Sequence, residues 1–229
     1  MGRWPMLVIF DCDGVLVDSE ALALDCARRA FSELGVELSA ERTRDLFLGV
    51  SQRTMRRTAL SSFGLNLPDG FEDRLTSATV ARFERELKGV EGLREALSTL
   101  GATVCVASSS PPERIRASLN IVGFASLFGD RVFSASEVAH GKPAPDLFLH
   151  AAGRCGVAPD ACLVIEDSPP GVAAARRAEM TVLGFVGGAH ALGHDYRQKL
   201  RDAGAAAIFD DMSDLPRLIE SARNELAHD

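Results

Sequence analysis

The stretch LVIFDCDGVLVDSE, residues 7–20, constrains the fold more than any other part of the chain. Its first four residues are apolar and lead into Asp11, Asp13 and Gly14, a pattern typical of a buried strand that ends in a turn. Side chains alternate along a strand, so both acids would lie on one side, facing the ligand crevice at the strand's carboxyl end. Adjacent carboxylates repel each other unless a cation or a proton intervenes. Mg²⁺, which takes oxygen ligands, is the simplest such cation.

The alternation of strands and helices along most of the chain predicts an α/β fold with a doubly wound parallel sheet. Further strands are predicted at residues 103–107, 131–134, 162–165, 180–185 and 206–209. Helical segments separate them, as the crossover between parallel strands requires. We therefore expect a Rossmann-like core.

One long segment, residues 35–89, contains no convincing strand. Helices are predicted in it at residues 39–46, 51–63 and 70–88. Another helix, which Asp18 or Ser19 would cap, precedes the segment. The expected domains are an α/β core of residues 1–17 and 90–229 and an inserted α-helical cap domain of residues 18–89.

Composition and charge exclude several classes of function. The 229-residue chain carries a formal net charge of −7, so it lacks the basic character of a nucleic-acid-binding domain. No apolar run approaches the ~18 residues of a membrane span. The five cysteines are odd in number and lack CxxC spacing, which favours reduced core thiols. We expect a soluble, cytoplasmic and monomeric protein without nucleic-acid or membrane partners.

Three further stretches place polar residues at or near predicted strand ends. TVCVASSSPPE carries Ser108, Ser109 and Ser110, HGKPAPDLF carries Lys142, and LVIEDSPPGV carries Glu166 and Asp167. Ser110, with Pro111 next and Glu113 three residues on, predicts a capping box for the following helix. Each stretch alone is a weak signal, because serines before a helix are usually caps and a lysine beside prolines is usually a solvated loop residue.

Together these stretches carry a family resemblance. DCDGVLVDSE matches D-x-D-G-[TV], the first motif of the haloacid dehalogenase-like (HAD) hydrolases, and the serine, lysine and paired acids follow in that family's order. The helical insert resembles the cap of the β-phosphoglucomutase-like branch. The motif spelling and the GVEG junction resemble bacterial sugar-phosphate phosphatases, including 6-phosphogluconate phosphatase. The resemblance covers almost the whole chain and implies a Mg²⁺-dependent phosphatase acting on a small phosphorylated metabolite, either a sugar phosphate or phosphogluconate.

The resemblance also implies roles for four catalytic residues. Asp11 would attack phosphorus and form an aspartyl-phosphate. Asp13 would protonate the leaving alkoxide and then accept a proton from the hydrolytic water. Ser108 and Lys142 would stabilise charge on the transferred phosphoryl group.

The expected metal site combines both acidic stretches. By resemblance, the carboxylates of Asp11 and Asp167 and the backbone carbonyl of Asp13 would bind Mg²⁺. Glu166 would hold a metal-bound water.

Two departures from the mutase pattern favour hydrolysis. Mutases of this branch carry a histidine twelve residues after the nucleophile, where this chain has Ala23, and an arginine directly after a GVS turn, where it has Gln52. The acid at position 13 argues against dehalogenation, which needs no protonated leaving group. A phosphomutase remains the closer alternative, and a non-catalytic phospho-receiver or binding module the distant one.

Substrate recognition is the least constrained part of the prediction. Phosphate or substrate contacts are expected from Ser108, Ser109, Lys142, Gly49, Ser51, Arg53 and Glu20. The loop at residues 49–53 resembles the cap loop that closes over substrate in relatives. Five arginines in residues 39–64 give a local positive charge that would suit an anionic substrate, although solvated helix faces are the more common explanation (Arg42, Arg44, Arg53, Arg56 and Arg57).

The segment GGAHALGHDYR contains two histidines, His190 and His194, at a spacing that suggests a zinc pair. Neighbouring glycines disfavour a helix there, and no cysteine or acid cluster completes a tetrahedral site. We expect a surface loop.

Overall fold

The computed structural model describes residues 6–191 and 194–226. Six parallel strands form one sheet in the order β3-β2-β1-β4-β5-β6, which confirms the predicted fold class. The strands are β1 (Leu7–Phe10), β2 (Thr103–Ser108), β3 (Val132–Ser134), β4 (Cys162–Glu166), β5 (Thr181–Phe185) and β6 (Ala207–Phe209). The apolar run of β1 lies at the centre of the sheet, with Leu7 opposite Thr103 on one side and Cys162 on the other.

Helices cover both faces of the sheet, and alternate residues of each strand point into one layer or the other. One layer contains α8 (Asp146–Cys155), α9 (Pro169–Arg177) and α10 (His194–Asp202). The other contains α5 (Leu93–Thr99), α6 (Pro112–Ile121), α7 (Ala125–Phe128) and α11 (Leu215–Leu226). Short 3₁₀ helices follow or precede strands at Ala135–Glu137, Pro159–Ala161, Ala189–Ala191 and Met212–Asp214. Because β1 and β4 lie at the centre of the sheet and are buried on both faces, each contains an unbroken run of apolar residues.

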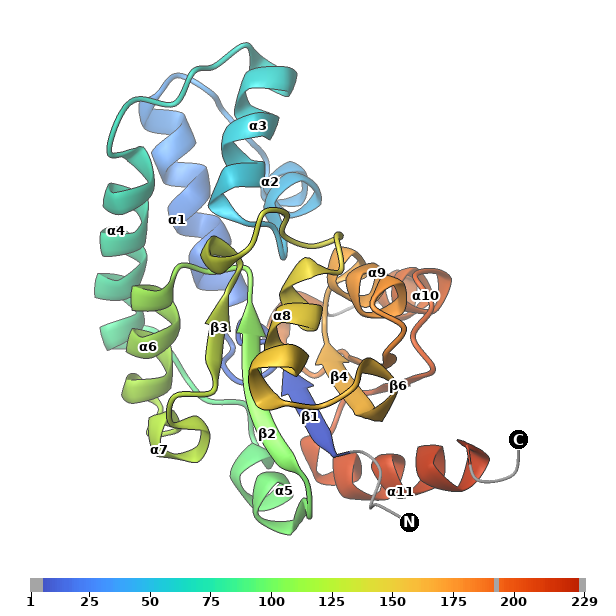
Figure 1. Cartoon of the computed structure of the whole chain (residues 1–229). Helices are drawn as coiled ribbons and strands as arrows, with labels where there is room; N and C mark the ends of the chain where they lie inside the picture. Colours follow the sequence, from blue (N-terminus) through green and yellow to red (C-terminus); the bar gives the residue numbers. More distant parts are fainter. Residues whose placement is uncertain (1–5, 192–193, 227–229) are drawn as a thin grey trace.

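The predicted helical insert forms a separate layer over the carboxyl ends of the strands (Figure 1). It contains α1 (Glu20–Glu33), α2 (Ala40–Phe47), α3 (Gln52–Phe63) and α4 (Phe71–Glu86). These helices have their own hydrophobic cluster around Phe31, whose ring stacks on Phe47 at 4.9 Å between centroids. The chain enters and leaves this layer side by side, because Val17 and Gly89 form an antiparallel bridge. We call this layer the cap domain; its boundaries at residues 18 and 89 stay a prediction.

Three local predictions differ from the structure, and each lies near the strand ends. Ser110 does not cap α6: Pro111 occupies the N-cap position, and no side chain makes a cap hydrogen bond. Ser19 occupies the N-cap position of α1 but makes no cap bond either. The described part of the predicted surface loop is not one: Ala189–Ala191 form a 3₁₀ helix with the His190 side chain buried, and α10 begins at His194, while residues 192–193 lie outside the described residues. In each case a contact with an acid of the site replaces the local structure that the sequence favoured.

All five cysteines are free, and four of them are buried, as expected of core thiols. Within the described ranges no helix is both long enough and apolar enough to cross a membrane.

Candidate active site

Asp11, Lys142 and Glu166 form a buried charged cluster at the end of β1. The Lys142 ammonium lies 2.6 Å from Glu166 Oε1 and 3.1 Å from Asp11 Oδ1. Burial alone would lower the pKa of Lys142, but the two carboxylates raise it above its ordinary value, so the ammonium stays charged. Lys142 therefore does not lie in a solvated loop: its side chain is fully enclosed, beside the position from which the predicted nucleophile would attack.

Asp167 completes an acidic site beside this cluster. Ligand atoms of Asp11, Glu166 and Asp167 all lie within 4.8 Å of one another. Glu166 is held through its second oxygen by the backbone N–H and the hydroxyl of Ser168, at 2.7 and 2.9 Å. Among the described residues, neither oxygen of Asp167 has a hydrogen-bond partner, although both are buried.

This arrangement fits a hard divalent cation. Burial raises the pKa of Asp11 well above its usual value, and Glu166 and Asp167 raise it further, against the opposing effect of Lys142. Burial likewise raises the pKa of Asp167. Unpaired buried carboxylate oxygens are costly, and a cation with oxygen ligands would remove that cost. The donor set suits Mg²⁺, with Asp167 free to bind and Glu166 already committed to other donors.

Glycine is required where the first motif meets Asp167. Gly14 has a φ of +77°, and a Cβ at that position would lie 1.9 Å from Asp167 Oδ2. The glycine of D-x-D-G therefore lets the backbone of the first motif pass directly against the acid of the fourth.

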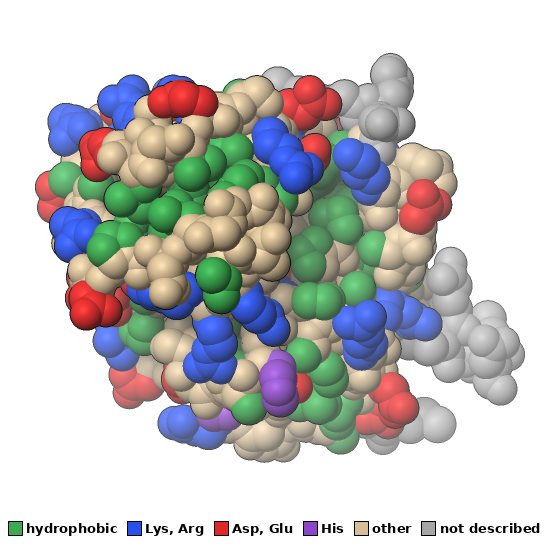
Figure 2. All heavy atoms as spheres, turned by 90° about the horizontal axis from the view of Figure 1, so that it is seen from above, with side chains coloured by type: hydrophobic (Ala, Val, Ile, Leu, Met, Phe, Trp, Pro, Cys, Tyr) green, Lys and Arg blue, Asp and Glu red, His purple; other side chains and the backbone are tan. Residues whose placement is uncertain are grey.

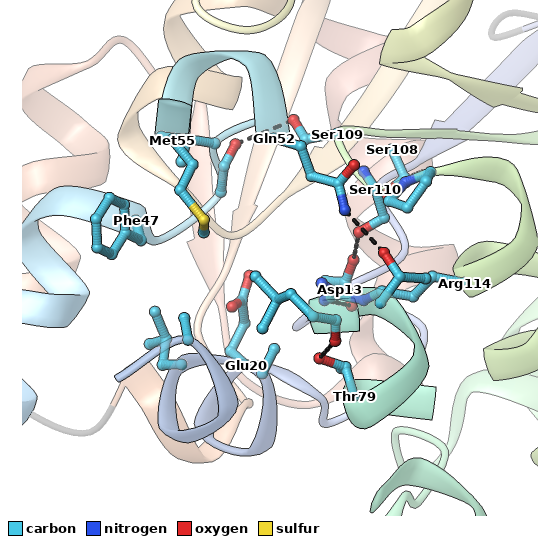
Figure 3. Close-up of a pocket in the computed structure, with 18 of the residues that line it drawn as sticks. Asp13, Glu20, Phe47, Gln52, Met55, Thr79, Ser108, Ser109, Ser110 and Arg114 are labelled. Carbon is cyan, nitrogen blue, oxygen red and sulfur yellow. Dashed lines mark hydrogen bonds and ion pairs between the residues drawn. The ribbon is translucent and has the colours of Figure 1, made fainter. Parts of the chain in front are cut away.

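Asp13 projects into a neighbouring pocket, where Figure 3 shows Ser110 and Arg114 beside its carboxylate; Ser19 is the third donor. Ser19 and Ser110 hydroxyls each donate at 2.5 Å, and Arg114 forms an ion pair at 2.7 Å. Burial would raise the pKa of Asp13, but Arg114 and the two hydroxyls outweigh it and lower the pKa. The carboxylate is therefore ionised in this form.

The same pocket brings together several other predicted residues. Ser108 and Ser109 line it with Asp11, Asp13 and Glu20. Ser108 is buried, and its oxygen accepts a hydrogen bond from the backbone N–H of Ser110 at 3.1 Å. Burial raises the pKa of Glu20 well above its usual value, and among the described residues Glu20 forms no ion pair with an arginine. Glu20 therefore presents a carboxyl group to the pocket.

The cap domain closes this pocket to about 60 Å³. The Ser109 hydroxyl donates to the Gly49 carbonyl at 3.0 Å, which links core to cap. Gly49 also approaches the core closely: a Cβ there would lie 2.7 Å from Ser168 Oγ. Ala23 and Gln52 are among the cap residues that line the pocket.

Ser51 and Arg53 lie outside this pocket. Ser51 caps α3 by accepting from the backbone N–H of Thr54, and Arg53 donates a hydrogen bond to the Ala139 carbonyl of the core. Both line a second, outer cavity of about 650 Å³ that adjoins the first at Gln52 and Ser109.

Sequence reasoning missed Arg114, His190 and Tyr196. Arg114 lies in the first turn of α6, four residues after Ser110, a spacing that offers a signal only once the position of Asp13 is known. His190 lies with Nε2 2.9 Å from Asp167 Oδ2, without hydrogen-bond alignment, and burial lowers its pKa. Neither its spacing nor the surrounding glycines pointed to Asp167.

Comparisons with known proteins agree with this geometry. A family model described as haloacid dehalogenase-like hydrolase matches residues 5–179. The 6-phosphogluconate phosphatase of Escherichia coli K12 is 32% identical over 184 residues, covering 80% of this chain and 83% of that protein. A β-phosphoglucomutase of Mycobacterium bovis is 31% identical over 239 residues, covering 90% of each. Among solved structures, a HAD-like protein of unknown function from Agrobacterium tumefaciens is 36% identical with a TM-score of 0.79, covering 95% of this chain and 98% of that one. The family and the name of the 6-phosphogluconate phosphatase support a phosphatase enzyme, and the chain belongs to the haloacid dehalogenase-like hydrolase family.

Proposed function

We propose that this protein is a Mg²⁺-dependent phosphatase that hydrolyses a small phosphorylated metabolite, a sugar phosphate or phosphogluconate, through an aspartyl-phosphate. The observation that carries the proposal is the buried cluster of Asp11, Lys142, Glu166 and Asp167 beneath a closed pocket that contains a second acid, Asp13. The names of the curated relatives support the substrate class.

In the first step, an Asp11 oxygen bonds to phosphorus while the bond to the leaving oxygen breaks, and Asp13 gives that oxygen a proton. In the second step, water attacks phosphorus of the aspartyl-phosphate and gives a proton to Asp13, while the bond between phosphorus and the Asp11 oxygen breaks and inorganic phosphate leaves. Lys142 and Ser108 stabilise negative charge on the phosphoryl oxygens. Bound by Asp11, Asp167 and the Asp13 carbonyl, Mg²⁺ would supply further charge stabilisation.

The surroundings of Asp13 suit the second of these steps. An ionised carboxylate is ready to accept a proton from water, and Arg114, Ser19 and Ser110 keep Asp13 ionised in this form. For the first step Asp13 must gain a proton, so substrate binding has to weaken the contact with Arg114.

Hydrolysis is favoured over the mutase alternative by the lining of the closed pocket. Ala23 lies there, at the position where mutases of this branch carry a histidine, and no histidine is among the described residues that line it. Gln52 lies where those mutases carry an arginine, and its amide donates to Thr76 Oγ1 at 2.8 Å. A receiver module, the distant alternative, has no helical cap over its acids.

The outer cavity is the proposed place for an anionic group remote from the transferred phosphate. Arg53, Arg57 and Arg177 line it, and none has a carboxylate within ion-pair distance among the described residues. Figure 2 shows basic side chains gathered across the middle of the face seen from above. Arg53 would contact substrate here, with the Gly49–Ser51 turn closing beside it. If Arg53→Ala leaves KM unchanged for every good substrate, this assignment fails.

The function is tested by phosphate release from a panel of sugar phosphates, phosphogluconate, nucleotides and phosphoglycolate with Mg²⁺. EDTA and Asp11→Asn are the controls, and both should abolish release. Interconversion of sugar phosphates without release would instead favour the mutase. A cytoplasmic, monomeric enzyme without nucleic-acid or membrane partners stays a prediction, consistent with five free thiols.

A further inference from the structure

Asp167 is held by more than the strand that carries it. Its carboxylate makes no hydrogen bond to any described residue, yet two features lie against its Oδ2. One is the Gly14 backbone, where an added Cβ would meet Oδ2 at 1.9 Å. The other is the imidazole of His190, with Nε2 2.9 Å from the same oxygen.

The imidazole is itself fixed. His190 is only 4% exposed, and both of its ring nitrogens lack a hydrogen-bond partner among the described residues. Its ring meets Tyr196 edge to face, at 5.7 Å between centroids and 89° between planes. An added Cβ at Gly188 would lie 2.8 Å from two atoms of the ring, so the backbone also confines it.

Tyr196 links this arrangement back to the same acid. Its hydroxyl donates to the Asp167 backbone carbonyl at 2.7 Å. The segment after β5 therefore contacts Asp167 twice, through His190 at the carboxylate and through Tyr196 at the backbone. His190 is not among the residues that line the catalytic pocket; it lines a separate groove with Arg44 and Lys199.

We propose that His190 and Tyr196 are positioning residues for the metal site. His190 Nε2 lies 2.9 Å from Asp167 Oδ2 and would donate to that oxygen once the unbonded carboxylate turns to bind the cation through Oδ1, while Tyr196 fixes the backbone beneath it. The inference rests on the proposed metal-dependent function. An outer partner of this kind sets how well a carboxylate is oriented before the metal arrives, and its removal typically costs 10- to 100-fold in metal affinity.

The test is Mn²⁺ binding to the purified full chain, followed by electron paramagnetic resonance without substrate, with Mg²⁺ as competitor. His190→Phe, which keeps a ring but removes both nitrogens, should weaken Mn²⁺ binding about 10- to 100-fold. His190→Gln should recover part of the affinity because its amide donates. Tyr196→Phe should weaken binding through loss of one hydrogen bond.

His150→Phe is the matched control. His150 also pairs with a carboxylate, Glu137, at 3.2 Å, but it lies on α8 and lines neither the catalytic pocket nor the groove at His190. The His150→Phe variant should bind Mn²⁺ with the affinity of the wild type. Unchanged affinity in folded His190→Phe, or an equal loss in the control, would overturn the proposal. If His190→Phe does not fold, wild-type affinity in Tyr196→Phe overturns it. Failure of the wild type to bind Mn²⁺ would instead refute the proposed metal-dependent function.

Discussion

Replacing Gly14 by alanine tests how closely the first motif must approach Asp167. A Cβ at Gly14 would lie 1.9 Å from Asp167 Oδ2, whereas ordinary contacts begin at 3.4 Å, so the carboxylate would have to move. A displacement of about 1 Å in a catalytic group costs ~10²-fold in rate. The left-handed backbone costs an L-residue roughly 1–2 kcal/mol. We therefore expect Gly14→Ala to lower kcat/KM by at least ~100-fold, to weaken Mg²⁺ binding, and to reduce the free energy of unfolding by about 1–2 kcal/mol.

Gly35→Ala is a control that introduces the same backbone strain as Gly14→Ala without the contact with Asp167. Gly35 has a φ of +81°, and nothing lies within 4 Å of an added Cβ. The control should lose a similar amount of stability in urea denaturation followed by circular dichroism, yet keep wild-type phosphate release and Mg²⁺ affinity. Wild-type activity in Gly14→Ala would refute the argument that its close approach places Asp167. Equal loss of activity in both variants would assign the effect to backbone strain.

Three further predictions concern charge and closure. Arg114→Ala should raise the pKa of Asp13 and so shift the acidic limb of the kcat–pH profile to higher pH. In the wild type, the lowered pKa of Asp13 stabilises the fold above the ordinary Asp pKa of ~3.9, and this stabilisation disappears as pH falls through the pKa of the folded state. The difference in stability between variant and wild type should therefore close in acid. An unshifted profile would contradict this. Lys142→Met should abolish phosphate release. Because it leaves buried carboxylates unpaired, it should also lower the free energy of unfolding, measured by urea denaturation without metal, by about 3–5 kcal/mol. A decrease below ~1 kcal/mol would show that the ion pair is not buried in solution. Ser109→Ala removes one hydrogen bond between core and cap domain, to Gly49, so it should change KM by no more than about tenfold, and loss of all activity would give the hydroxyl a chemical role.

The acids and the lysine of the site were predictable because each follows a strand or lies in a motif of fixed order. Asp11, Glu166 and Asp167 end apolar runs, and parallel strands bring their carboxyl ends to one edge. The local pattern predicts these acids at one edge of the sheet, whereas their grouping as a metal site came from the family resemblance; in the structure their ligand atoms lie within 4.8 Å of one another.

The sequence did not predict contacts between elements far apart in the chain. The sequence pattern around Ser110 is that of a helix cap, but its hydroxyl donates a hydrogen bond to Asp13, ninety-seven residues away. This charge-assisted hydrogen bond outweighs a local cap. Gln52 and Arg53 are neighbours at the start of α3, and adjacent helical residues point in different directions, so the glutamine enters the pocket and the arginine faces the outer cavity. Which of the two faced inward depended on how α3 packs.

The close approach of Gly49 to Ser168 means that the cap domain is not an interchangeable module. Ser168 holds Glu166 through its N–H and hydroxyl, and a side chain at position 49 would push against that hydroxyl when the cap domain closes. A cap grafted from a relative to change substrate choice would therefore carry its own turn into contact with the loop of Glu166 and Asp167, the acids of the proposed metal site. Transplants that keep glycine at this turn should preserve catalysis while specificity changes; those that lack it should disturb the metal site however well the new cap fits its substrate.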